Sequence, residues 1–516
     1  MLFALVANAI ELPDIIGDNM MLQQQTQARL WGWAAAGNTI EVRTSWNNKT
    51  YNTRVAADGR WDITVATPKA SYEQYAITFV EKKGQKQVDS QTAQNVLIGE
   101  VWFCSGQSNM EMPLGGFWNC PVEGANEAIA LSAKYKKAIR VATIDRDGKD
   151  EPQKKVAGKW DTCEPKNAGK FSACGYFFAQ TLTDMLDIPV GIINCSWGGS
   201  CVEGWMPKEI LLTYPDGLTP MDDTSYHKKM VMFNGMLAPL AGYSVKGFLW
   251  NQGESNCGNG EEYCKRFSVM TRLWRKMWAE GGAYHALTTN DINALSSDKT
   301  ATGAQLPIYA VELPGYRYGT DESDMCANFR VWQHKIKESL ANYDCVTTTD
   351  LMYDYEPLQI HGCRKQPIGQ RLAYLALAND YGMEGIGAKA PEFEYAEAHE
   401  ASDADVQVIA GTAVEKNANE KGTVYHLYFT NSTDGFDRLS GIEGFEALGS
   451  DGQWHKATVW SDSAWQNVKR QGCFLKLVCP EAGTIKAIRY RFHNFNYGHA
   501  LHNLRGLPVV PFNQNI

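Results

Sequence analysis

Polar and hydrophobic residues alternate along the first part of the chain, as they do in strands with one buried face. The alternation is clear in Thr39–Thr44, and the segment Val55–Ile63 carries Asp58-Gly59, a pair typical of a β-hairpin turn. These signals predict an N-terminal β module over residues 10–95.

The period changes from Val96 onward. Apolar strands such as Val190–Cys195 and Val245–Trp250 now alternate with segments of helical period. This order indicates a parallel sheet covered by helices on both faces, and we predict an α/β domain over residues 96–385. The predicted helices are Val122–Ala138, Gly175–Leu186, Glu261–Glu280, Asn328–Asn342 and Ile368–Tyr381.

Strand signals return after Gly387, in Thr423–Phe429 and Ala487–Phe492. The segment Leu448–Trp454 repeats the Asp-Gly-x-Trp pattern of the first module, which we interpret as shared hairpin chemistry and not as a sequence repeat. Residues 386–516 are therefore predicted to form a C-terminal β-rich module.

The composition is that of a folded protein with several domains. The chain has 516 residues, and its 49 basic and 58 acidic residues give a net charge of -9. A basic surface for nucleic acid is therefore not expected, whereas a small uncharged or anionic ligand is compatible with this charge. The 16 Trp and 23 Tyr suit sugar binding, although protein cores use most such rings.

The first nine residues, MLFALVANA, are predicted to be the remnant of a secretory signal. Ala7-Asn8-Ala9 fits the small-residue rule for signal peptidase, although a basic leader is missing. We expect a secreted or periplasmic protein without a membrane span, since no later segment has the roughly 20 apolar residues that a span needs. The 13 cysteines are compatible with some disulfides, but their spacing indicates no metal site, and no cofactor is expected.

Small polar groups follow several of the predicted parallel strands. Ser108, Gly198-Gly199, Gln252 and His361 each lie beyond such a strand, the last of them beyond Val346–Thr349. Because the carboxyl ends of parallel strands meet at one edge, where open α/β sheets bind ligands, we expect these residues to share a crevice.

These residues include each group that acyl transfer requires. We predict Ser108 as the nucleophile, in preference to Ser105, which is closer to the strand, and His361 as the base. The backbone N–H groups of Ser108 and of Gly198 or Gly199, with the side-chain amide of Gln252, are the expected oxyanion donors.

Four sequence blocks contain these residues: GEVWFCSGQSNMEMP from Gly99, INCSWGGSCVEGWMP from Ile193, GFLWNQGESN from Gly247 and IHGCRKQPIGQRLA from Ile360. The blocks resemble those of the sialate O-acetylesterases, carbohydrate esterases of the SGNH-hydrolase superfamily. The resemblance implies a flavodoxin-like three-layer α/β/α domain, flanked by N- and C-terminal β-sandwich-like modules, that removes acetyl groups from sugar hydroxyls without a cofactor. It implies the same site roles for Ser108, Gly198, Gly199, Gln252 and His361.

One part of the pattern is missing. Superfamily relatives often carry an Asp two or three residues before the His, where this chain has Gln359 and Leu358, and Gly362 replaces the Pro that usually follows. Two arrangements remain open: a Ser-His dyad oriented by Gln359 or a backbone carbonyl, or a triad with a displaced acid. The candidate acids are Glu254, Asp350, Asp354 and Glu356.

The expected substrate is O-acetylated sialic acid or a sialoglycan, and acetylated xylan or another polysaccharide is the alternative. A non-catalytic glycan-binding protein is a third interpretation, which the intact Ser108, Gln252 and His361 disfavour. A cation near the pocket would pair with a sialate carboxylate, and the candidates are Arg317, Arg330 and Lys365.

Overall fold

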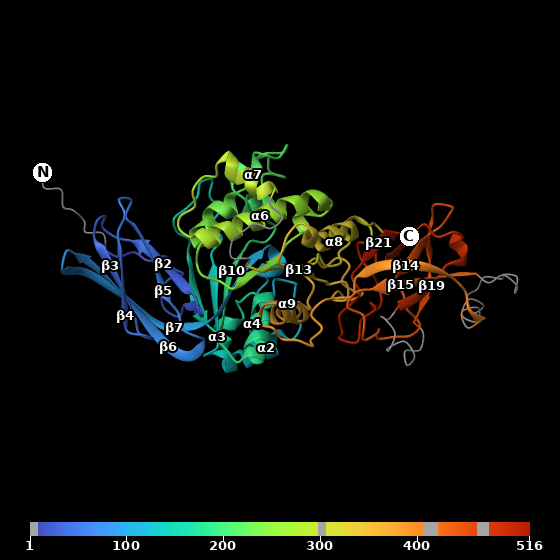
Figure 1. Ribbon diagram of the computed structural model, residues 1–516, viewed down its shortest axis with the longest axis horizontal. Coiled ribbons are helices and arrows are strands. Elements are labelled where there is room, and N and C mark those ends of the chain that lie inside the picture. The colour runs from blue at the N-terminus through green and yellow to red at the C-terminus, as the bar shows by residue number, and fades with distance from the viewer. Residues whose placement is uncertain (1–8, 298–305, 404, 406–421, 462–473) are drawn as a thin grey trace.

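The structure is a computed structural model that describes residues 9–297, 306–403, 405, 422–461 and 474–516. Figure 1 shows an elongated molecule with the N-terminal strands at one end, helices and strands in the middle, and the C-terminal strands at the other end. Residues 1–8 lie outside the described residues, so the signal remnant stays a prediction.

The N-terminal strands form two groups. β2 (Gln27–Trp33) pairs with β5 (Arg60–Ala66), whereas β3, over the predicted Thr39–Thr44, pairs with β4 (Lys49–Arg54) and β6 (Ser71–Lys83). Asp58-Gly59 forms the expected turn, but the prediction of a hairpin is wrong. Because β4 and β5 pair with different strands, this turn connects two groups of strands.

A single long strand, β7 (Lys86–Gly106), links the N-terminal strands to the central sheet. Its first part pairs antiparallel with β6 and parallel with the short β1 (Met21–Gln23). Its last part pairs parallel with β10 (Val190–Ser196) and β11 (Gly247–Asn251). The predicted boundary between residues 95 and 96 therefore falls inside one continuous strand.

The central sheet has the strand order β13-β12-β11-β7-β10-β8-β9, and all its strands are parallel except β9. Counted from β7, the parallel strands lie in the order 2-3-1-4-5-6. A flavodoxin-like sheet has the order 2-1-3-4-5, so here the third strand lies between the first and the second. The remaining strands are β8 (Ile139–Ile144), β9 (Gly158–Thr162), β12 (Ile308–Val311) and β13 (Tyr343–Val346).

The last strand of this sheet ends earlier than predicted. β13 stops at Val346, where the sequence pattern placed a strand over Val346–Thr349. The buried Glu312 carboxylate accepts the Thr347 hydroxyl and the Thr348 N–H, both at 3.0 Å. These bonds turn the chain away from the ladder.

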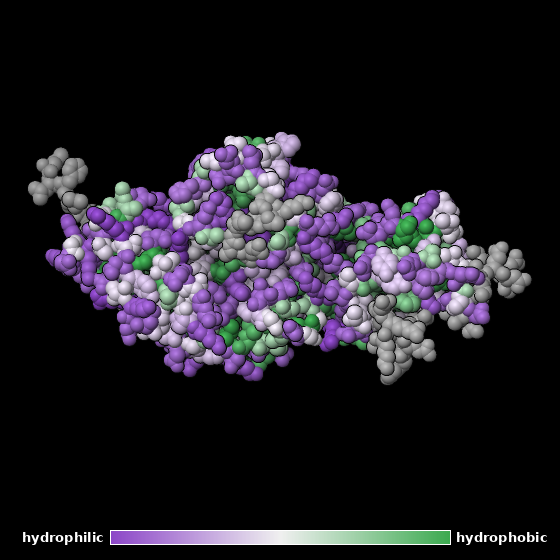
Figure 2. Space-filling model, viewed as in Figure 1, coloured by the Kyte–Doolittle hydropathy of each residue, from purple (hydrophilic) through white to green (hydrophobic). Residues whose placement is uncertain are grey.

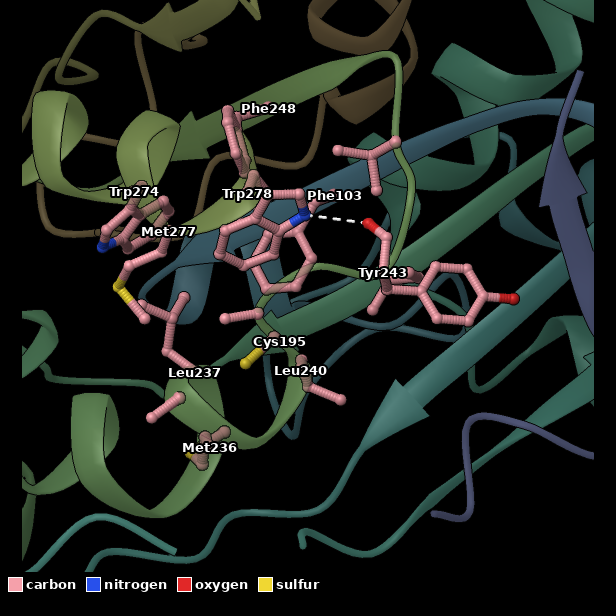
Figure 3. Packing of buried hydrophobic residues seen from close by; sticks show 14 of the residues in the cluster. Phe103, Cys195, Met236, Leu237, Leu240, Tyr243, Phe248, Trp274, Met277 and Trp278 are labelled. Carbon is pink, nitrogen blue, oxygen red and sulfur yellow. Dashed lines mark hydrogen bonds between the residues drawn. The ribbon is translucent and has the colours of Figure 1, made fainter. Parts of the chain in front are cut away.

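Helices cover both faces of the sheet because side chains of β7 alternate between them. Trp102 and Cys104 belong to the hydrophobic cluster with α4 (Ala173–Leu186) and α9 (Lys365–Asp380). Phe103 belongs to the other cluster, with α6 (Gly260–Glu280) and α8 (Met325–Lys335). Figure 3 shows Phe103 with Phe248, Trp274 and Trp278, whose indole N–H donates to the Tyr243 carbonyl at 2.9 Å.

The predicted helices are present, but two are shorter than expected. The helical period from Val122 gives α2 (Ala125–Leu131) and then a 3-10 turn, and α8 likewise ends in a 3-10 turn at Ile336–Glu338. The remaining α-helices are α1 (Ser108–Glu111), α3 (Pro165–Ala168), α5 (Lys208–Leu211) and α7 (Thr289–Ser297).

Two four-stranded antiparallel sheets form the C-terminal region, with Leu427, Phe445, Leu475 and Ile488 buried in one cluster. The predicted hairpin at Leu448–Trp454 is confirmed, because these two residues pair directly. One sheet contains β14 (Phe393–Glu400), β15 (Thr423–Phe429), β19 (Phe474–Val478) and β18 (Thr458–Trp460). The other contains β17 (Trp454–Lys456), β16 (Phe445–Leu448), β20 (Ala487–Tyr490) and β21 (Phe512–Asn515).

Figure 2 shows a largely hydrophilic face with small, separate apolar patches. Within the described residues, no helix combines the length and apolar character needed to cross a membrane. The cysteines in that part of the chain are all free thiols.

The end of β7 meets the end of β11 backbone to backbone at Gly106. Gly106 has a φ of +130°, and a Cβ there would lie 2.2 Å from the Asn251 carbonyl oxygen. That oxygen accepts the N–H of Gln107 at 3.0 Å. Only glycine satisfies both this backbone conformation and this approach.

We predict that Gly106→Ala lowers the free energy of unfolding by more than about 2 kcal/mol, because it adds both backbone strain and a clash. Denaturant unfolding measures the change. Gly17→Ala is the matched control, since its Cβ would meet nothing closer than 3.8 Å, and it should stay within about 0.5 kcal/mol of the parent. Equal stability of the two variants would contradict the prediction.

Candidate active site

The loops that follow β10, β7 and β11 meet at one edge of the sheet. The Gly106 carbonyl accepts the N–H of Trp197, and the N–H of Gln107 donates to the Asn251 carbonyl, both at 3.0 Å. Since these are main-chain bonds, the sheet itself fixes the loop that carries Ser108.

Ser108 is the first residue of α1 and is half-buried. Gln107 before it is extended, with a φ of −113°, so the chain turns sharply into the helix. Ser105, in contrast, is fully buried within β7. Of the two serines, Ser108 is therefore the one that a substrate can reach.

Asn109 joins the nucleophile loop to the loop that carries His361. Its side-chain N–H group donates to the Ile360 carbonyl at 3.0 Å and also to the Glu254 carboxylate. The buried Lys365 ammonium donates to the Asn109 amide oxygen. We did not expect a role for Asn109, although it adjoins Ser108 in the same block.

His361 is held by a thiol and an amide. Its Nδ1 lies 3.6 Å from the Cys120 Sγ, and this thiol donates to the Gln359 Oε1 at 3.3 Å. The same oxygen accepts the backbone N–H of His361 at 3.2 Å. With the thiol proton directed at Gln359, a sulfur lone pair is available to Nδ1–H, and the ring then carries its free lone pair on Nε2.

The other ring nitrogen, Nε2 of His361, is buried and has no hydrogen-bond partner among the described residues. Within the same residues, no carboxylate lies within 4.0 Å of the ring nitrogens, and no hydrogen bond joins Ser108 to His361. Burial, and secondly the charge of Lys365, lower the pKa of His361 to about 4. The imidazole is therefore neutral near pH 7 and able to accept a proton.

The four candidate acids have other partners. Asp350 pairs with Arg371 at 2.6 Å and contacts His502 at 3.1 Å, and these bonds outweigh its burial and hold its pKa below the usual value. Glu254 contacts Asn109, and burial raises its pKa. The other two accept backbone N–H groups. Asp354 accepts that of Gly498 at 2.9 Å, and Glu356 accepts those of Tyr353 at 2.8 Å and Cys363 at 3.4 Å.

No three His, Cys, Asp or Glu side chains in the described part of the chain are placed to hold a metal ion.

The two glycines after β10 differ in their available N–H groups. The Gly198 N–H donates to Glu111 at 2.8 Å, and Glu111 forms two hydrogen bonds of 2.6 Å with Arg146. The backbone N–H groups of Ser108 and Gly199 donate to no acceptor within the residues that the structure describes. These two donors are therefore available to an oxyanion.

Gly199 has a φ of +79°, and a Cβ there would lie 2.6 Å from the Tyr226 ring. A larger residue would disturb this turn. The predicted donor Gln252 is fully buried, and its amide N–H group contacts three acceptors: the Gln107 Oε1, the Ser200 carbonyl and the Asn256 Oδ1. Gln252 thus joins the three loops.

The three cations considered from the sequence are engaged elsewhere. Arg317 forms two bonds with Asp321, Arg330 is buried and donates to backbone carbonyls, and Lys365 contacts Asn109. Sequence reasoning missed Arg146, whose half-exposed guanidinium lies over the Trp197 ring, 5.9 Å from its centroid. A Cβ at Gly198 would lie 3.3 Å from the Ser108 Cβ and 3.5 Å from the Arg146 Nη2, so this cation stands beside the nucleophile.

Comparison with known proteins gives consistent matches. The family model described as "Carbohydrate esterase, sialic acid-specific acetylesterase" matches residues 98–378. The chain is 30% identical over 283 residues to the human sialate O-acetylesterase, covering 52% of this chain and 53% of that protein. It is 25% identical over 424 residues to the mouse sialate O-acetylesterase, covering 73% and 74%. The chain thus spans about half the length of the human relative.

A solved structure resembles nearly the whole chain. It is that of XAC1771, a carbohydrate acetylesterase from Xanthomonas citri, with a TM-score of 0.77 and 25% sequence identity. The match covers 98% of this chain and 99% of that one.

We predict that the pKa of His361 is about 4 and that Lys365→Met raises it, because the variant removes the second cause of the shift. NMR of protein labelled in its histidine rings follows the titration, and the resonance lost in His361→Gln assigns the signal. A midpoint near the ordinary value of about 6.5 in the parent protein would contradict the burial of this ring.

Proposed function

The chain belongs to the carbohydrate esterase family of sialic acid-specific acetylesterases, and we propose that it hydrolyses O-acetyl esters on sugars, with O-acetylated sialic acid or a sialoglycan as the first expected substrate. The observation that carries the proposal is the Asn109 bridge, which holds the Ser108 loop against the loop of His361. A half-buried serine and a neutral, half-buried histidine thereby belong to one site.

In the proposed reaction, His361 Nε2 takes the proton of the Ser108 hydroxyl while the oxygen attacks the acetyl carbonyl. The carbon–oxygen double bond becomes an oxyanion, which the N–H groups of Ser108 and Gly199 stabilise. The oxyanion then collapses, the sugar oxygen leaves with the proton held by His361, and an acetyl-Ser108 ester remains. Water, deprotonated by the same imidazole, releases acetate and restores the hydroxyl.

Cys120 and Gln359 take the place of a triad acid in this proposal. A carboxylate would fix the tautomer of His361 and stabilise its protonated form, whereas a neutral thiol fixes the tautomer alone. The dyad arrangement is therefore the one that the contacts of His361 favour. The low pKa of the ring agrees with this, because no nearby negative charge raises it.

The sialate substrate is proposed from the family match, because the Arg146 guanidinium beside Gly198 is already paired with the Glu111 carboxylate through two hydrogen bonds of 2.6 Å. Neutral acetylated polysaccharides such as xylan remain the alternative, since they present the same ester.

We further propose that the central region is the three-layer α/β/α domain of the SGNH hydrolases, flanked by two β-sandwich-like modules. The helices on both faces of a largely parallel sheet support this assignment. The proposed site lies outside the carboxyl ends of β10 and β11, the strands on either side of β7. Open α/β sheets bind ligands at such positions.

We predict that Ser108→Ala lowers the rate of acetate release from mono-O-acetylated sialic acid by about 10³-fold or more, since only binding and oxyanion stabilisation remain. Ser105→Ala, a buried position in the strand β7 that leads to Ser108, is the matched control and should stay within about tenfold of the parent. Acetylated xylan in the same assay distinguishes the two substrate classes. Retention of activity by Ser108→Ala, or no acetate from either substrate with the parent protein, would refute the proposed function.

The orientation of His361 gives a separate prediction. Glu254→Gln, Asp350→Asn, Asp354→Asn and Glu356→Gln should each lower kcat by no more than about 10²-fold, whereas loss of a true triad acid costs about 10⁴-fold. Cys120→Ala should lower kcat about tenfold, the equivalent of one hydrogen bond of about 1.4 kcal/mol.

Cys120→Ser is the matched variant, because a hydroxyl can also accept from Nδ1–H and donate to Gln359, and it should recover most of the lost rate. His361→Ala sets the level of complete base loss. Any carboxylate variant as impaired as His361→Ala would establish a triad in place of the dyad.

A further inference from the structure

Trp118 is the most exposed of the large hydrophobic residues in the described part of the chain, with 90% of its surface accessible. It lies with Asn119 at the tip of a turn in which Phe117 and Cys120 exchange two backbone hydrogen bonds of 3.0 Å. Asn119 has a φ of +61°, a left-handed conformation that asparagine tolerates. A defined turn therefore holds the indole in solvent.

The residues on either side of this tip contact the proposed base. The Phe117 ring meets the His361 ring edge to face at 5.3 Å, and the Cys120 Sγ lies 3.6 Å from its Nδ1. The side-chain N–H group of Gln359 also donates to the Asn119 carbonyl at 3.3 Å. The exposed indole is thus placed next to the loop that carries His361.

A second aromatic surface lies near the loop that carries His361. The rings of Tyr353 and Tyr355 stack with centroids 5.2 Å apart and an angle of 11° between their planes, and Tyr355 is 77% exposed. The Tyr353 hydroxyl donates to Glu123 at 2.6 Å, and the Arg364 guanidinium lies over its ring at 5.4 Å. Tyr353 is therefore fixed, and Tyr355 offers a ring.

These two tyrosines line a cleft of about 410 Å³, within the roughly 300–1,000 Å³ of small-ligand sites. The C-terminal residues Gly498, His499, Ala500 and His502 also line it, and its polar groups include Asp354, His499 and Arg364. The cleft therefore combines an aromatic surface with hydrogen-bonding groups of both kinds.

The cleft adjoins the loop that carries His361. Met352 lines the cleft, and its sulfur lies 2.5 Å from where a Cβ of Gly362 would be, directly after His361. Glu123, which binds Tyr353, also donates its N–H to the Cys363 carbonyl at 3.0 Å. The Trp118 turn, the His361 loop and the cleft thus form one connected surface.

Sugar rings suit this surface because they present C–H groups on one face and hydroxyls at the edge. Aromatic rings have a negative face that attracts such C–H groups, and the polar groups of the cleft can bind hydroxyls. We propose that Trp118 and Tyr355 bind sugar residues next to the acetylated one, so that the substrate is a glycan chain and not a free monosaccharide. This inference rests on the proposed function and gives the C-terminal module a part in substrate binding.

The test compares short and long substrates in Trp118→Ala and Tyr355→Ala. The probes are acetylated xylobiose and xylohexaose, together with mono-O-acetylated sialic acid, free and at the end of a sialylated trisaccharide. In the parent protein, kcat/KM should be at least tenfold higher for the longer substrate of one pair than for the shorter one, mainly through a lower KM. Each variant should lower this long-to-short ratio of kcat/KM at least fivefold.

Tyr395→Ala is the matched control, because Tyr395 is an exposed tyrosine (44% accessible) that stacks on Tyr428 in the C-terminal sheet, and it should leave the ratio unchanged. Calorimetric titration of Ser108→Ala with deacetylated xylohexaose and the sialylated trisaccharide measures binding without turnover. Adding Trp118→Ala or Tyr355→Ala should weaken the binding at least fivefold.

The outcomes separate this inference from the proposed function. If the parent protein releases acetate but its rates and Ser108→Ala affinities are the same for short and long glycans, or neither aromatic variant changes them, the inference is overturned and the esterase assignment stands. If the parent releases no acetate while glycan binding depends on Trp118 and Tyr355, the esterase proposal fails and the binding surface stands.

Discussion

The arrangement of the site depends on one main-chain contact, between the end of β7 at Gly106 and the end of β11 at Asn251. The two backbones are too close for any side chain on Gly106, and hydrogen bonds from this point reach both neighbouring loops. The position of Ser108 is therefore set by the pairing of three parallel strands. Side chains such as Gln252 and Asn109 then connect the loops.

Two features determine the electrostatics of the site: the proposed base, His361, is partly buried, and no carboxylate among the described residues contacts its ring. A histidine with a low pKa is a weak base, but it is neutral over the whole physiological range, so none of it is inactivated by protonation. Lys365 contributes to this, because its charge is buried close by and opposes a second positive charge. The Asn109 amide lies between Lys365 and Glu254 and contacts both, which gives each of these buried groups one hydrogen bond.

Hydrophobic periodicity predicted the strands and helices of the centre and the edge at which their loops meet, because these depend on local pattern and on the geometry of parallel sheets. It could not predict the contact between Cys120 and His361, since Cys120 lies far away in the sequence and reaches the ring only through the tertiary fold. The same holds for Glu111, whose carboxylate accepts a hydrogen bond from the N–H of Gly198. Local turn chemistry also misled us at Asp58-Gly59, because the same dipeptide serves a hairpin and a connection between different sheets.

The continuity of β7 has a consequence for how the protein folds and how it can be divided. A strand that belongs to two sheets cannot leave one without weakening the other, so the N-terminal strands and the catalytic sheet form a single cooperative unit. Recombination between related chains at the apparent module border would cut through paired backbone and expose an unprotected strand edge. Exchangeable borders in this architecture therefore lie elsewhere, in segments that cross no ladder, such as the connection between α9 and β14.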